Sequence, residues 1–126
     1  MRYVTQDDPV LAKKAQAIFK RVKEGSLRAT TCESIVSECV YILSSKRLYH
    51  LPRAHIAAIL KVILSFQGLK HNHKKTYMRA LNLYASSSLD FEDTVAVAHM
   101  ERQHITDIYS FDRDFDRIEG IKRRTA

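Results

Sequence analysis

Apolar residues recur every three or four positions through most of the chain, which is the spacing of one face of an α-helix. Asp8 is a natural N-cap for the first helix, Pro9 suits its first turn, and Gly25 follows its last residue. We therefore predict five helices, at residues 9–24, directly after 31, from 52 up to 68, over 73–86 and over about 90–104. The second helix is expected to bury Ile35, Val36, Cys39, Val40 and Leu43.

Short β-prone segments lie between and after these helices, at residues 27–31, 69–72, 106–110 and 118–122. Because strands alternate with helices, the pattern favours an α/β fold with a parallel sheet. So few strands make a thin sheet, and the periodicity alone leaves a helical bundle as an alternative.

The chain has the length and composition of one globular domain, which we place over residues 1–126. Its 3 glycines and 2 prolines are too few for a sandwich or barrel of many short strands. No apolar run approaches the roughly 18 residues that span a bilayer, and the first residues do not have the pattern of a secretory signal. Cys32 and Cys39 are two helical turns apart, too far to bridge each other, so we expect reduced thiols in a cytoplasmic protein.

Charge is unevenly distributed along the chain, whose formal net charge is +7. No acidic residue occurs from Cys39 to Leu89, and nine of the fourteen acids lie between Asp90 and Glu119. This excess of positive charge predicts an anionic partner. A basic groove beside a carboxylate cluster suits an enzyme that cuts phosphodiesters with a divalent metal. A solvated basic surface followed by an acidic one is the simpler interpretation.

Two acidic segments are candidate sites. Asp90 and Asp93 begin the last predicted helix, where a capping pair that complements the helix dipole is their simplest interpretation. Residues 112–116 carry acids at alternate positions, as an EF-hand does, but Arg117 and Arg123 occupy the places of its glycine and glutamate. The segment is then a turn after a strand, which is where open α/β sheets bind ligands.

Other polar residues carry weaker signals. Glu38 lies off the apolar face of the second predicted helix, where an exposed acid is common. The pairs His71 with His73 and His99 with His104 lack the spacing of a shared metal site. With only 3 glycines, the chain also has no Gly-rich phosphate loop.

Four segments between Arg2 and Arg124 share a recognisable order: RYVTQDDP, TTCESIVSECVYILSS, LDFEDTVAVAHMERQ and DIYSFDRDFDRIEGIKR. The last two are the most specific, with an acidic helix start, small apolar residues along the helix, and a strand that leads into S-F-D-R-D-F. Together they resemble the PIN domain family, in particular the small VapC-type toxin ribonucleases. The resemblance implies a three-layer α/β/α fold with a small parallel sheet.

The resemblance also assigns site residues by position. Glu38, Asp93 and Asp112 match the catalytic carboxylates that hold Mg²⁺ or Mn²⁺ in the family. Further metal ligands are expected among Asp90, Asp114 and Asp116. Carboxylate oxygens are the ligands that these hard cations prefer, with waters completing the shell.

The function implied by the resemblance is that of a metal-dependent endoribonuclease of the toxin–antitoxin type. Its substrate would be structured RNA such as tRNA or rRNA, bound along the acid-free segment 39–89. The expected protein partners are a small antitoxin and a second copy of the chain, with no membrane involved. A degenerate PIN-like module that binds RNA or protein without cleavage is the alternative, and a helical nucleic-acid-binding protein is a third.

One feature of the family has no counterpart in the given sequence. PIN domains begin with a central strand that ends in a metal-binding Asp, before the segment matched by residues 2–4. Asp7 and Asp8 match an additional turn and do not replace that acid. We therefore interpret the chain as shortened at its N-terminus, and expect the preceding coding sequence to contain a short apolar run ending in Asp. Without it, we expect association and little ribonuclease activity.

Overall fold

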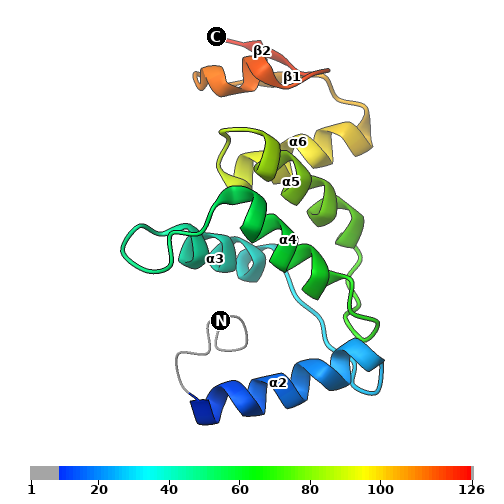
Figure 1. Cartoon of the computed structure of the whole chain (residues 1–126). Coiled ribbons are helices and arrows are strands. Elements are labelled where there is room, and N and C mark those ends of the chain that lie inside the picture. The colour runs from blue at the N-terminus through cyan, green and yellow to red at the C-terminus, as the bar shows by residue number, and fades with distance from the viewer. Residues whose placement is uncertain (1–8, 126) are drawn as a thin grey trace.

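The computed structural model describes residues 9–125, apart from the side chains of Pro9 and Leu11 (Figure 1). The expected cap at Asp8 lies outside the described residues. In chain order the elements are α2 (Pro9–Glu24), α3 (Glu33–Ser44), α4 (Arg53–Leu64), α5 (Lys74–Ser86), α6 (Phe91–Gln103), β1 (Asp107–Tyr109), the 3-10 helix η1 (Arg113–Arg117) and β2 (Lys122–Arg124). The five predicted helices are confirmed, with ends within a few residues of the predicted ones.

The elements follow one another from one end of the molecule to the other. Figure 1 shows α2 at one end, the strands and η1 at the opposite end, and α3 to α6 between them. Helix α5 packs against α4 on one side and against α6 on the other. No helix within residues 9–125 is both long and apolar enough to cross a membrane.

Two apolar clusters hold these elements together. The larger joins α3, α4, α5 and α6 around fully buried side chains such as Leu43, Ile56 and Leu81. The smaller attaches η1 and the segment before β2 to α5 and α6, and consists of Leu83, Leu89, Val97, Phe115, Ile118 and Ile121. The prediction that Ile35 is buried is wrong, because its side chain is 52% exposed and lines an open apolar cavity between α2 and α3.

The strands pair in parallel, which confirms a mixed α/β fold with a small parallel sheet. In that sheet Asp107 lies opposite Lys122, and Tyr109 opposite Arg124. A separate parallel bridge joins Ala29 to Leu69, in two of the predicted β-prone segments.

The last predicted strand, 118–122, is displaced toward the C-terminus. Ile118 and Ile121 lie in turns, since the Ile118 N–H donates to the Phe115 carbonyl at 3.1 Å and the Ile121 N–H to the Ile118 carbonyl at 3.3 Å. These turns bury both isoleucines in the smaller apolar cluster. Extended backbone therefore begins only at Lys122.

Candidate functional site

Helix α6 begins with a group of acids whose carboxylates do not cap it. Asp90 occupies the predicted N-cap position with extended backbone, but its side chain makes no capping hydrogen bond. Asp93 follows one turn later and is partly buried. Helix capping therefore does not explain the carboxylate of Asp90.

The environment of Asp93 disfavours its negative charge. Burial contributes most to the raised pKa of this carboxyl, followed by the charges of Asp90 and Asp112 and then that of Glu92. Asp112 belongs to the turn after β1, so the fold brings acids from two separate segments near each other. Neighbouring carboxylates repel each other, which favours the protonated form of one of them. A bound cation would relieve this repulsion.

The turn after β1 holds Asp112 in a defined position. Its Oδ1 accepts a hydrogen bond from the Asp114 N–H at 2.9 Å, and its own N–H donates to Ser110 Oγ at 3.1 Å. Asp112 thereby caps η1 and remains exposed. The resulting arrangement is two carboxyls, Asp93 and Asp112, at the boundary between α6 and the strand end, with Asp90 beside them.

The PIN domain family model matches residues 2–121 of the chain. The chain belongs to the PIN domain family. No curated protein and no solved structure matches it. PIN domains are generally nucleases that depend on a divalent metal, which is consistent with a group of carboxyls after a parallel strand.

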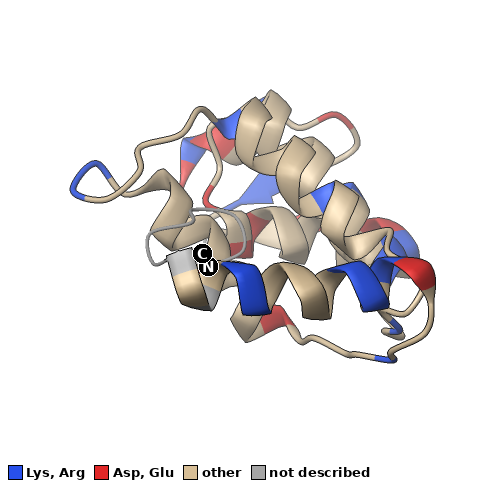
Figure 2. Cartoon of the chain, turned by 60° about the horizontal axis from the view of Figure 1, so that its bottom comes forward, with Lys and Arg blue, Asp and Glu red and all other residues tan. Residues whose placement is uncertain are grey.

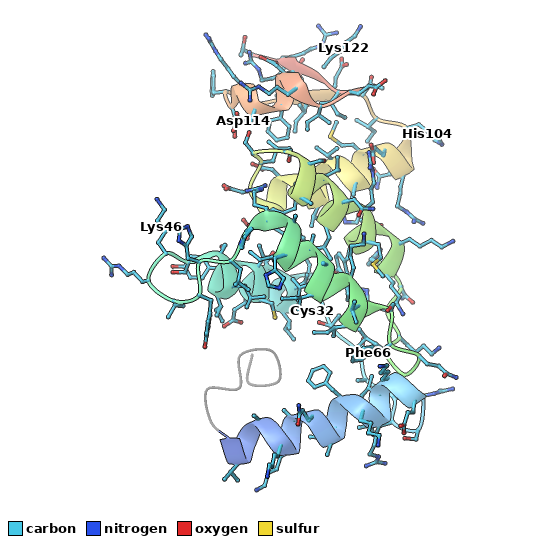
Figure 3. All side chains as sticks on the ribbon, viewed as in Figure 1. Cys32, Lys46, Phe66, His104, Asp114 and Lys122 are labelled. Carbon is cyan, nitrogen blue, oxygen red and sulfur yellow. The ribbon has the colours of Figure 1, made fainter. Side chains whose placement is uncertain are left out.

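In this PIN domain, Asp116 and Asp114 do not share the surroundings of Asp93 and Asp112. Arg123 on β2 forms an ion pair with Asp116 at 2.9 Å and keeps the pKa of that carboxyl low. Asp114 instead lines a cavity beneath η1, on the side of the loop that joins α5 to α6 (Figure 3). Their expected roles as additional metal ligands stay predictions.

Glu38 lies on the exposed side of α3, a helix that touches α6. Its charge is not among those that raise the pKa of Asp93, whereas Asp90 and Asp112 are. Its nearest described effect is on the adjacent thiol of Cys39, whose pKa is raised by burial and, to a smaller extent, by Glu38. A shared site with Asp93 and Asp112 therefore stays a prediction for Glu38.

The donor chemistry of this PIN domain fits a hard divalent cation. Within residues 9–125, no three His, Cys, Asp or Glu side chains are placed to hold a metal together. Mg²⁺ commonly takes only one or two carboxylates and fills its shell with waters and substrate phosphates. Asp93 and Asp112 are the residues that would hold such a cation, with Asp90 as the adjacent acid.

Arg53 holds the chain before Asp90 in place through long-range contacts. In the sequence it is only one positive charge among many. Its Nε donates to the Tyr84 carbonyl at 2.7 Å, and its Nη2 donates to the Leu89 carbonyl. The guanidinium carbon also lies 3.7 Å from the centre of the Tyr84 ring. Arg53 thus ties the start of α4 to the residue immediately before Asp90, and no local pattern could have revealed contacts of such long sequence separation.

Proposed function

We propose that this PIN domain is a VapC-type, metal-dependent endoribonuclease that acts on structured RNA such as tRNA or rRNA. The observation that supports it most is the raised pKa of Asp93, which burial causes first and the charges of Asp90 and Asp112 increase, with Asp112 held in the turn after β1. A bound Mg²⁺ or Mn²⁺ would activate a water and neutralise charge on the phosphate under attack. Asp93 and Asp112 would hold the cation, and the hydrogen bonds of Ser110 and Asp114 would keep Asp112 in place.

The acid-free segment 39–89 is the proposed RNA-binding surface. Figure 2 shows basic residues at the tip of the loop between α3 and α4, and Figure 3 labels Lys46 there. This loop is ordered by turns, because the N–H groups of Leu48 and His50 both donate to the Ser45 carbonyl, at 3.0 and 2.9 Å. Arg53 follows this loop and donates to the Leu89 carbonyl, next to Asp90. The basic side chains at the loop tip would contact RNA phosphates. Contacts of this kind release counterions and weaken as salt rises.

The proposed partners are a cognate antitoxin and a second copy of the chain. Large apolar side chains exposed on α3 and α4 support a protein interface, namely Tyr41 at 71% and Val62 at 58% exposure. The proposed location is the cytoplasm, where the free thiols of Cys32 and Cys39 would stay reduced.

Metal binding and RNA cleavage test the catalytic proposal together. Mn²⁺ affinity is measured by electron paramagnetic resonance, and cleavage is followed on end-labelled tRNA with Mn²⁺ or with EDTA. We expect Asp93→Asn and Asp112→Asn each to weaken Mn²⁺ binding at least about tenfold, since each removes one of few anionic ligands. Glu24→Gln is the matched control, because it removes an exposed acid on α2, far from Asp93, and should leave the affinity nearly unchanged. Equal Mn²⁺ affinity in all four proteins would contradict the proposed centre.

A non-catalytic PIN-like module that binds RNA or protein is a second candidate. It is supported by the lack of a three-donor group within residues 9–125. The same experiment separates the two functions. RNA binding that is unaffected by EDTA, without cleavage in Mn²⁺, would establish the binding module and reject the nuclease.

A further inference from the structure

A cavity of about 450 Å³ lies between the last turns of α5, the serine loop at residues 86–88 and the segment 114–119. It is separate from the Asp93–Asp112 pair but adjoins it, because the Asp114 N–H is bonded to Asp112 while the Asp114 side chain lines the cavity. Its volume is within the range of small-ligand pockets.

The lining combines an apolar floor with polar walls. Leu83 and Ile118 form the floor and are only 6% and 9% exposed. In the described part of the chain, Asp114, Arg117 and Glu119 form no ion pair, although all three line the cavity. The walls therefore offer two carboxylates and one guanidinium that are free to meet a ligand.

Arg79 adds a planar group to the same cavity. Its Nε and Nη2 donate to the two carboxylate oxygens of Glu101 at 2.9 and 3.0 Å, and this two-point contact orients the guanidinium. Guanidinium planes of this kind are common stacking partners for RNA bases. A flat, partly apolar ring would fit this cavity. Its faces would contact the apolar floor and the Arg79 guanidinium, and its hydrogen-bonding edge would meet the charged side chains of the walls.

We propose that this cavity binds a nucleobase of the RNA and prefers guanine, an inference that rests on RNA being the ligand of this PIN domain. Carboxylates accept hydrogen bonds and donate none, so they select a base edge that carries N–H groups. Guanine presents two adjacent donors, N1–H and the N2 amino group, which match the two oxygens of one carboxylate. Adenine and cytosine present an amino group beside an acceptor, and uracil presents one N–H between two carbonyls. Glu119 and Asp114 are the carboxylates that would accept hydrogen bonds from the N1–H and N2 amino groups of guanine.

Titration with the four nucleoside 5′-monophosphates in EDTA tests the proposal without any cleavage. Methyl resonances of Leu83 and Ile118 are followed by NMR, together with the affinity of each nucleotide. We expect 5′-GMP to shift both methyls and to bind more tightly than 5′-UMP. Glu119→Gln should weaken 5′-GMP binding about tenfold, the loss expected for one bidentate base contact, and should leave 5′-UMP unchanged.

Glu24→Gln serves as the matched control, because Glu24 is an exposed acid on α2, at the opposite end of the molecule. Equal affinities for the four nucleotides, or unshifted Leu83 and Ile118 methyls, would overturn the inference and leave phosphate binding alone. Selective 5′-GMP binding without any RNA cleavage would instead reject the nuclease and keep the base site. RNA cleavage without nucleotide selectivity would reject the base site and keep the nuclease.

Discussion

Among single residues, Asp93 shows how the candidate site affects stability. Burial and the charges of Asp90 and Asp112 raise the pKa of its carboxyl above the unfolded value of 3.8. The folded state therefore binds this proton more tightly than the unfolded state. The resulting stability is complete below the unfolded pKa and is lost as pH rises through the folded pKa.

Asp93→Asn should therefore raise the melting temperature at pH 7 and have little effect at pH 3. The gain should be at most about 1 kcal/mol, since the side chain is only partly buried. Thermal melts at both pH values measure it, with Glu24→Gln on α2 as the control. Adding Mn²⁺ should stabilise the wild type more than the variant. A variant that is less stable at every pH would show that Asp93 is needed for packing.

At the scale of elements, the segment between α4 and α5 comes unusually close to the end of α2. The Gly68 N–H donates to the Val22 carbonyl at 2.6 Å, and the next residue forms the bridge with Ala29. A Cβ at Gly68 would lie 2.1 Å from the Leu27 carbonyl oxygen and 2.7 Å from that of Val22. Only glycine permits this contact, because both neighbours are backbone atoms that cannot turn away.

Gly68→Ala should consequently destabilise the fold by more than about 2 kcal/mol, because the contact can be relieved only by shifting the backbone at Leu27 and Val22. Urea unfolding measures the loss. Gly120→Ala is the matched control: Gly120 has a φ of +83°, but a Cβ there would meet nothing within 4 Å. Its cost should be limited to about 1 kcal/mol for the left-handed backbone. Equal losses for the two variants would contradict a tight contact at Gly68.

The whole molecule contains a second, larger cavity of about 610 Å³ with a mostly apolar lining. It lies between α2, α3, α4 and the segment 29–31, and Ile18, Val36 and Leu60 are among its lining side chains. Ile18 and Ile35 also line it and are 53% and 52% exposed, so the cavity is open and leaves apolar side chains in contact with water, which is unfavourable. One wall is extended backbone. Ala29 directs its N–H and carbonyl toward residues 68 and 70, so the backbone groups of Arg28 and Thr30 face the other way.

We predict that an apolar strand can fill this cavity by pairing along the Thr30 side. A separate six-residue Val/Ile peptide ending in Asp, added to the protein, should raise its melting temperature, because the peptide would cover the apolar lining. A Ser/Asn peptide of the same length is the control and should leave the melting temperature unchanged. Calorimetry measures both effects, and an unchanged melting temperature with the apolar peptide would contradict the prediction.

Several features follow from residues that are neighbours along the chain. The apolar repeat and Gly25 predict α2 through Glu24, because a helix forms between residues one turn apart. The position of the acids at the start of α6 and after β1 is likewise evident from the sequence. The family resemblance, carried by local motifs, is confirmed over residues 2–121.

Other features depend on contacts between distant residues, and only the tertiary structure shows them. Ile35 has helical spacing but is half exposed, because it lines the open apolar cavity between α2 and α3 instead of packing in the core. Ile121 is turned into a core that no local pattern specifies. The pairing of Asp116 with Arg123 depends on how β2 lies beside η1, and the effect of Asp112 on the pKa of Asp93 depends on how the turn after β1 lies relative to α6. Periodicity records which face of an element is apolar, whereas charge interactions and cavities depend on distances between atoms that the chain brings together only by folding.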